Sequence, residues 1–198
     1  LNFMKKIVLN LIVILMTCMS FVSCAYERVD AGCEGIYVNL YGDDKGVGEV
    51  SLCSGAVWYC PLTHDVFEYP TYIQTVDYPS FEVNSKDGTK FTVDPAVLVK
   101  IEDGKSPLIF KKYRKQLEEI VKNTLYVYTR DAARIEFNKY TADQIVSNRE
   151  AVDKSFEERV RKSFAKEHFI LQQLTPGIGY PKSYEDAINQ KNKAIQDE

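Results

Sequence analysis

The sequence has only two histidines, His64 and His168, and this scarcity removes most of the common catalytic and metal sites. A histidine-based triad has few ways to form, because His64 and the following Asp65 would point to opposite faces of a strand. Neither histidine lies at a metal-ligand spacing from a cysteine, and Gly-x-Ser-x-Gly, Gly-x-x-x-x-Gly-Lys and His-Glu-x-x-His motifs are absent. Gly177-Ile178-Gly179 lacks a third glycine and is flanked by prolines, which is typical of a turn that ends a strand. We therefore predict no enzymatic activity, no cofactor and no metal site.

Strong charge of one sign is also missing from the sequence. The 198 residues include 25 lysines and arginines and 28 aspartates and glutamates, which gives a formal net charge of −3. Binding to a nucleic-acid backbone needs clustered positive charge, and the sequence has no such excess. We therefore predict no nucleic-acid partner.

The first residues of the sequence form a charged and then apolar segment that is typical of an export signal. Two lysines precede the apolar run 7–16, which is followed by smaller residues up to Cys24. The residues just before Cys24 make this site similar to the lipobox of bacterial lipoproteins, in which the cysteine thiol is diacylated and becomes the first mature residue. We therefore predict lipidation of Cys24, with residues 1–23 as the signal peptide or membrane anchor. Because the lysines stay on the cytoplasmic side, we expect the rest of the chain on the periplasmic side of the bacterial cell membrane.

Two other interpretations of this segment stay open. Residues 7–26 are 20 residues without a charge, which is long enough to cross a bilayer as an uncleaved helix. Phe21 stands where the lipobox usually has leucine, and this departure keeps the signal-anchor interpretation open. In the third interpretation, Cys24 is a buried structural thiol.

The cysteines beyond the signal are few. Export permits disulfides, and Cys53 and Cys60 are close enough in sequence to pair across one loop. This pairing would leave Cys33 over, and a disulfide-framework domain would contain more cysteines. Cys53–Cys60 is therefore a candidate disulfide and not a requirement of the fold.

The first half of the exported chain alternates apolar and polar residues, which predicts strands. In the clearest case, Ile36, Val38 and Leu40 alternate with polar or aromatic residues. Turn formers separate the runs, and Asp87-Gly88 is the signal of a hairpin. The expected strands are residues 35–41, 49–53, 65–69, 72–78, 81–85, 91–94 and 96–101. Their order predicts an antiparallel β-meander that follows a short polar leader.

The second half has the period of a helix. Apolar residues at spacings of three and four from Ile109 to Val121 predict one helix packed on the sheet. Thr141-Ala142-Asp143-Gln144 has the spacing of a capping box, so we expect a helix to begin there and its apolar face to continue to Phe164. Glutamate-first pairs on the opposite face, worth only ~0.2–0.5 kcal/mol each, mark it as solvated. These pairs are Glu150 with Lys154, Glu157 with Arg161 and Glu158 with Lys162.

Two elements are expected after this helix. Residues 169–174 have the composition of a final strand, and Ser183-Tyr184-Glu185-Asp186 can cap a terminal helix. The fold class expected for the whole chain is therefore α+β, an antiparallel β-meander followed by helices packed on the sheet.

The order of these elements resembles the SPFH or Band 7 superfamily of stomatins, prohibitins and flotillins, in a prohibitin-like bacterial form with a lipoprotein-type signal. The resemblance covers nearly all of residues 29–198 and rests on order and spacing more than on any single motif. It divides the chain into the signal or anchor 1–23, a tether 24–30, an SPFH domain 31–181 and the start of a C-terminal coiled-coil helix 182–198. The segments that carry it are the apolar anchor, 55–61, 85–94 with the strand 96–101, 141–161 and 187–194.

This resemblance implies a membrane-tethered scaffold that self-assembles. Its partners would be copies of itself, membrane lipid and a membrane protein such as a membrane-bound protease, and its role would be to organise membrane patches or to regulate that protein. The surface expected to join neighbouring copies comprises Arg149, Glu150, Glu157, Arg161, Ala187, Lys191 and Ala194.

The residues also leave a different class of function open. A monomeric periplasmic lipoprotein could bind a ligand or a partner on the tyrosine-rich face of its sheet. The tyrosines in question are Tyr37, Tyr41, Tyr59, Tyr69, Tyr72 and Tyr78. Large side chains that simply cover a sheet give the same pattern.

Overall fold

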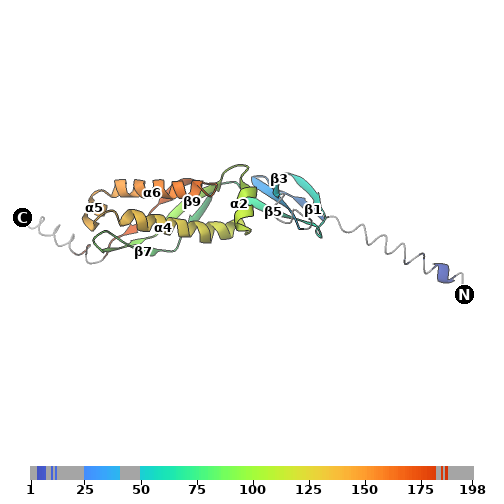
Figure 1. Ribbon diagram of the computed structural model, residues 1–198, viewed down its shortest axis with the longest axis horizontal. Coiled ribbons are helices and arrows are strands. Elements are labelled where there is room, and N and C mark those ends of the chain that lie inside the picture. Colours follow the sequence, from blue (N-terminus) through green and yellow to red (C-terminus); the bar gives the residue numbers. More distant parts are fainter. Residues whose placement is uncertain are drawn as a thin grey trace, which may run out of the picture. The chain divides into compact units, whose positions relative to one another are not determined.

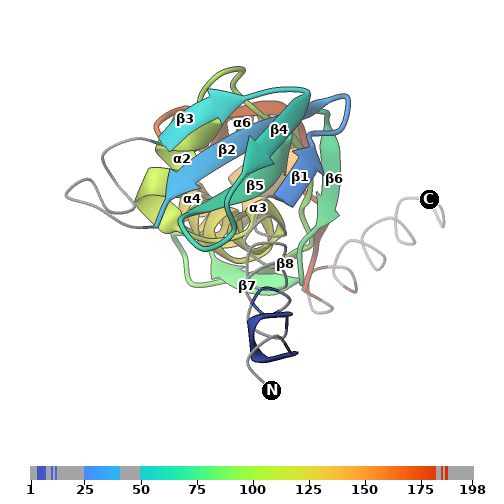
Figure 2. The same cartoon turned by 90° about the vertical axis from the view of Figure 1, so that its right-hand side faces the viewer.

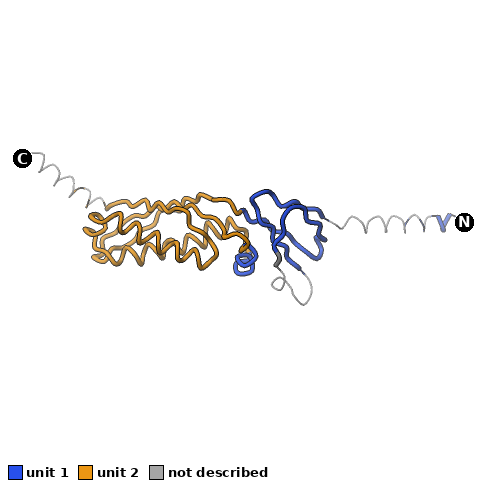
Figure 3. The backbone as a smooth tube through the Cα atoms, turned by 90° about the horizontal axis from the view of Figure 1, so that it is seen from above, with its two compact units in different colours: residues 1–70, 106–114 blue, residues 71–105, 115–198 orange. Residues whose placement is uncertain are grey.

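The computed structural model describes residues 4–7, 10, 12, 25–40, 50–181, 184 and 186. The chain forms two compact units, each built from two separate stretches of sequence (Figure 3). Unit 1 comprises residues 1–70 and 106–114, and unit 2 comprises residues 71–105 and 115–198. The predicted α+β class is confirmed, with antiparallel sheets and packed helices (Figure 1).

Unit 1 contains a two-stranded and a three-stranded antiparallel sheet. Its strands are β1 (Ala25–Arg28), β2 (Cys33–Asn39), β3 (Val50–Cys53), β4 (Ala56–Tyr59) and β5 (His64–Pro70). β1 pairs with β4, and β2 lies between β3 and β5 (Figure 2). Along β2, Ile36 and Val38 are buried while Tyr37 and Asn39 are half-buried, as an alternation of period two predicts.

β1 lies inside the segment that the sequence predicted as a tether. Its residues pair one by one with β4, and the Tyr59 hydroxyl donates a hydrogen bond to the Glu27 carboxylate at 2.8 Å. Neither strand was predicted, since residues 25–28 have the composition of a polar leader and residues 56–59 lie between turn-forming residues.

One helix of unit 1 packs against its strands. α2 (Ser106–Tyr113) buries Ile109 and Phe110. The ring of Phe110 lies 4.6 Å from that of Phe67 and 6.3 Å from that of Tyr69, both on β5. Aromatic pairs at such distances contribute about 0.5–1.5 kcal/mol beyond the burial of their area, so this cluster fixes α2 on the sheet.

Unit 2 contains two three-stranded antiparallel sheets. Its strands are β6 (Gln74–Asp77), β7 (Phe81–Asn84), β8 (Lys90–Val93), β9 (Ala96–Ile101), β10 (Phe169–Thr175) and β11 (Ile178–Gly179). β9 lies between β6 and β10, and β8 lies between β7 and β11. The stretch 177–179 after β10 was predicted as a turn, but Ile178–Gly179 form the strand β11, which pairs with β8.

The helices of unit 2 differ from the two expected helices in where they begin and end. They are α3 (Leu117–Glu119), the π-helical turn η2 (Ile120–Thr124), α4 (Leu125–Phe137), α5 (Ala142–Ser147) and α6 (Arg149–Ala165). One of them, α4, was not expected at all. The prediction of one helix from Ile109 to Val121 is wrong. Arg114 has a φ of 50°, and a residue in this left-handed conformation ends a helix. The apolar spacing therefore continues across a break, with α2 in unit 1 and α3 in unit 2.

The π-helical turn η2 joins α3 to α4 and is anchored from the sheet. The hydroxyl of Tyr78, a residue only 3% exposed, donates to the Val121 carbonyl in η2 at 2.9 Å. The Tyr78 ring also lies 5.5 Å from the ring of Tyr126 on α4. Because a buried hydroxyl needs a partner, this bond fixes where the helix widens.

The predicted capping box is confirmed. The Thr141 hydroxyl accepts from the Gln144 N–H at 3.4 Å, and the Gln144 side chain accepts from the Thr141 N–H at 3.1 Å. The helix does not continue unbroken to Phe164, however. Asn148 has φ −119° and ψ 39°, which are not helical values, and it separates α5 from α6.

Unit 2 is centred on aromatic side chains from a strand and two helices. α4 and α6 lie side by side (Figure 1). Phe137 on α4 lies 6.1 Å from Phe156 on α6 and 6.4 Å from Phe91 on β8, measured between ring centroids. All three side chains are fully buried. This cluster joins the helical layer to the sheet.

The predicted Asp-Gly hairpin turn between β7 and β8 docks on the start of α5. The Asp87 carboxylate accepts hydrogen bonds from the Ser85 hydroxyl and from the Ala142 N–H, the latter at 3.1 Å. The Lys86 N–H donates to the Tyr140 carbonyl at 2.8 Å. The hairpin turn therefore also contacts a helix whose first residue is 55 residues later in the sequence.

These bonds predict a pH-dependent stability. The Ser85 hydroxyl first, and the Ala142 N–H second, hold the pKa of Asp87 below its ordinary value. A carboxylate whose folded pKa is depressed stabilises the protein above its unfolded pKa, about 3.9, and loses that contribution as pH falls through the folded value. Asp87→Asn is expected to lower the urea midpoint at pH 7, and the difference from wild type should shrink below about pH 4.

The matched control is Asp103→Asn, since Asp103 is an exposed aspartate with no hydrogen bond in the described part of the chain. This variant should unfold like wild type at both pH values. A constant difference between Asp87→Asn and wild type across this range would contradict the assigned role.

Candidate functional site

The two histidines serve structural contacts. The ring of His64 stacks on Tyr37 at 4.7 Å, and its Nδ1 lies 2.7 Å from the Thr63 hydroxyl. His168 has a φ of 62° and places its Nδ1 3.3 Å from the Glu102 carboxylate. Among the described residues, no three histidine, cysteine, aspartate or glutamate side chains gather closely enough to hold a metal ion.

Cys33, Cys53 and Cys60 lie half-buried in unit 1. Burial first, and the Glu68 carboxylate second, raise the pKa of Cys33 and of Cys53, which disfavours the reactive thiolate. The candidate disulfide between Cys53 and Cys60 stays a prediction.

The sequence-predicted interface residues Arg149 and Glu150 lie at the start of α6 and differ in how firmly they are held. Arg149 lies 3.8 Å from the Asp153 carboxylate and donates to the Tyr180 hydroxyl at 3.3 Å. Glu150 is exposed and has no partner in the described ranges. Glu150 is thus the more available of the two for contact with another molecule.

Glu157 and Arg161, the other predicted interface residues on α6, form an ion pair at 2.5 Å. Arg161 also donates to the Leu171 carbonyl at 2.6 Å and so ties α6 to β10. Of the three expected pairs only this one forms within the described residues, because exposed pairs contribute little and rarely hold fixed rotamers. The face itself is solvated, as predicted.

Several predicted sites lie outside the described residues. These are the lipidation site Cys24 and the interface residues Ala187, Lys191 and Ala194. None of the described helices is both long enough and apolar enough to cross a bilayer.

An exposed aromatic pair that was not expected from the sequence begins two residues after the predicted lipidation site Cys24. Tyr26 on β1 stands directly opposite Trp58 on β4, with ring centroids 5.0 Å apart. Tyr26 is 53% exposed and Trp58 71%, and Leu62 in the following loop is 70% exposed. Exposed tyrosine and tryptophan side chains are typical of a surface that lies at the membrane interface, and these two follow or face the residues just after a predicted lipid attachment.

The fold defines an α+β domain in which antiparallel sheets precede and flank packed helices. The chain belongs to the SPFH domain / Band 7 family, whose family model matches residues 27–198. This match begins at residue 27, inside β1. No curated protein matches the chain. SPFH domains are typical of membrane-associated scaffolds that oligomerise.

Proposed function

We propose that this protein is a membrane-tethered scaffold of the prohibitin type, which assembles with copies of itself on the periplasmic side of a bacterial membrane. The family match over residues 27–198 is the observation that carries the proposal. In this role the protein organises a membrane patch or restrains a membrane protein, such as a membrane-bound protease, by contact and not by chemistry.

The predicted acylation of Cys24 supports a specific orientation of unit 1. Tyr26 is two residues after Cys24, so the two Cα atoms are at most about 7 Å apart. Tyr26 also faces Trp58 across the β1–β4 pair. An acyl chain on Cys24 therefore holds both rings at the level of the lipid headgroups, where tyrosine and tryptophan are favoured.

Attachment of every copy to the same membrane surface favours self-assembly. Subunits held on one surface meet at a high effective concentration, so weak contacts between neighbours add up. The exposed charged face of α6, with Glu150 accessible, and the terminal segment 182–198 are the proposed contacts between copies.

The proposed membrane contact of unit 1 should change the fluorescence of Trp58. Trp58 is the only tryptophan of the chain, so its emission reports this position alone. When the full chain is incorporated into vesicles, we expect the emission to shift to shorter wavelength, iodide quenching to fall several-fold, and brominated lipids to quench. Stern–Volmer titrations of the chain in vesicles, compared with free tryptophan amide in the same buffer, measure this change.

The control for this experiment moves the reporter away from the predicted surface. In a Trp58→Tyr variant that also carries Ile135→Trp, the new tryptophan occupies an exposed position of α4 in unit 2, since Ile135 is 50% exposed. In vesicles, its iodide quenching should be several-fold stronger than that of Trp58. Equal quenching of Trp58 and of the tryptophan introduced by Ile135→Trp in the same vesicles would refute the proposed orientation.

A further inference from the structure

A groove in unit 2 lies between the end of α4 and the outer side of α6. Its volume is about 460 Å³. Four cationic side chains line it, against two carboxylates, Glu136 and Glu158. The cations are Lys139, Arg159, Lys162 and Lys166. A groove with two surplus positive charges stands out in a chain whose net charge is −3.

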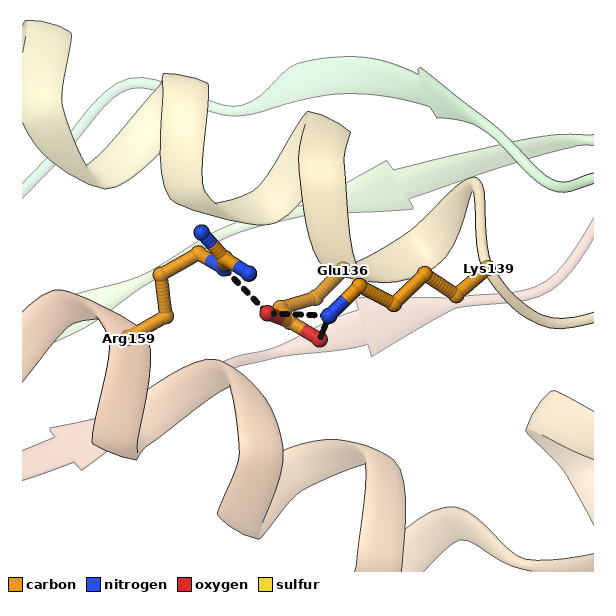
Figure 4. Close-up of polar contacts among 3 residues, drawn as sticks. All are labelled: Glu136, Lys139 and Arg159. Atoms are coloured by element: carbon orange, nitrogen blue, oxygen red, sulfur yellow. Dashed lines mark hydrogen bonds and ion pairs between the residues drawn. The ribbon is translucent and has the colours of Figure 1, made fainter.

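The floor of the groove is a buried carboxylate that holds two of these cations (Figure 4). The Glu136 side chain is 5% exposed. Lys139 donates to both of its oxygens, at 3.0 and 2.9 Å, and Arg159 donates to it through Nε. Burial alone raises the pKa of Glu136, but the bonds from Lys139 and Arg159 outweigh this and hold the pKa below its ordinary value. Glu136 therefore stays charged and orients the guanidinium.

The remaining donors of the groove have no partner among the described residues. Of the Arg159 guanidinium, Nε alone is engaged by a described residue, which leaves its two terminal nitrogens for another acceptor. Lys162 and Lys166 have no ion-pair partner, and the hydroxyls of Ser155 and Ser163 have no hydrogen bond, within the described part of the chain. Residues at spacings of three and four share one helix face, so Arg159, Lys162, Ser163 and Lys166 form a single stripe.

We propose that this groove binds a phosphate-bearing anion. A phosphomonoester carries about −1.5 to −2 charge at pH 7 and three acceptor oxygens. The two surplus positive charges match this charge, and the free edge of Arg159 presents two parallel donors to a pair of phosphate oxygens. Lys162, Lys166 and the Ser163 hydroxyl supply the donors for the third oxygen. The phosphate belongs either to a soluble compound or to a lipid headgroup.

Binding of inorganic phosphate to the full chain in neutral detergent tests the proposal. Isothermal titration calorimetry at constant ionic strength, with chloride as the competing anion, should give a saturable one-site isotherm. Lys162→Ala combined with Lys166→Ala is expected to lower the association constant at least about tenfold, because each removes a charge-assisted bond. Lys154→Ala is the matched control, since Lys154 is an exposed lysine of α6 that does not line the groove.

A second variant separates two effects of Glu136, namely the orientation of Arg159 and the negative charge that it adds to the groove. Glu136→Gln removes a negative charge from the groove, so charge alone predicts tighter phosphate binding. If Glu136 instead orients Arg159, Glu136→Gln binds phosphate more weakly. Arg159→Lys should also bind phosphate more weakly, because it keeps the charge but loses the two parallel donors of the guanidinium. Circular dichroism of each variant confirms that the fold is retained.

Competition with a phospholipid shows whether the bound phosphate comes from a lipid headgroup or from a soluble compound. Phosphatidic acid in the micelles should displace inorganic phosphate from wild type if the ligand is a headgroup, whereas no displacement assigns a soluble ligand. Phosphatidylcholine serves as the neutral lipid control. Phosphate binding no stronger than chloride binding, or an equal loss in Lys154→Ala, would overturn the proposal. The outcome is independent of the scaffold role, because no step of this assay depends on oligomer size.

Discussion

Replacing Phe137 with alanine is expected to lower the free energy of unfolding of unit 2 by about 3–5 kcal/mol. The side chain is fully buried and its ring contacts Phe91 on the sheet and Phe156 on α6. Alanine would leave a cavity at the point where both layers meet, and a close-packed core relaxes only in part around such a cavity. A loss of this size is a large share of the ~5–15 kcal/mol that stabilises a typical domain.

Urea unfolding followed by far-UV circular dichroism measures this effect. Tryptophan emission is unsuitable, because Trp58 belongs to unit 1 and reports that unit first. Ile135→Ala is the control, since Ile135 lies on the same helix but is 50% exposed and should change stability by at most about 0.5 kcal/mol. Similar losses in the two variants would mean that Phe137 is not central to the core.

Replacing Gly177 with alanine is the second substitution with a large expected effect. Gly177 has a φ of 58°, and its carbonyl accepts from the Asp94 N–H at 3.1 Å. A Cβ at this position would lie 2.1 Å from the Asp94 carbonyl oxygen. The left-handed backbone costs about 1–2 kcal/mol with a side chain, and displacing backbone from a packed site costs about 1–3 kcal/mol more. We expect a total loss of about 2–5 kcal/mol.

Gly104→Ala isolates the conformational part of this cost. Gly104 has a φ of 77°, but nothing lies within 4 Å of an added Cβ. Its substitution should therefore cost only the left-handed backbone penalty, about 1–2 kcal/mol. Thermal unfolding of both variants, followed by circular dichroism, gives the difference that is due to Asp94. If the two variants lose the same stability, the contact with Asp94 is not close.

The sequence predicted the elements that have a strong period or a specific cap. β2, β9 and the start of α5 were expected because alternation or a capping box marks them. The break at Arg114 was not expected, because no glycine marks a left-handed residue there and the apolar spacing continues past it. The α4 helix was also missed, since its tyrosines and buried glutamate disguise the apolar face.

The candidate surfaces were predictable only in part. The solvated face of α6 follows from charges spaced four residues apart, and the Glu157–Arg161 pair confirms it. The Glu136–Arg159 contact joins residues 23 positions apart on two helices, so only the fold brings them together. The exposure of Trp58 depends in the same way on the pairing of β1 with β4, two strands that are far apart in sequence.

These surfaces divide the proposed work between the two units. Unit 1 would contact the lipid headgroups through Trp58 and through Tyr26, which is two residues after Cys24. Unit 2 would carry the contacts between copies on α6 and the phosphate groove beside it. Because every subunit sits on the same surface, contacts too weak to form a dimer in solution would suffice to build an assembly on the membrane.

The mass of the complex that the full chain forms in its membrane tests this account most directly. The chain is purified from membranes in a mild detergent, and multi-angle light scattering gives the protein mass after subtraction of the detergent. The scaffold account predicts a mass many times the 22.7 kDa of one chain, and a smaller mass when residues 183–198 are removed. A mass of a single chain at every concentration tested would contradict the account and favour a monomeric binding lipoprotein.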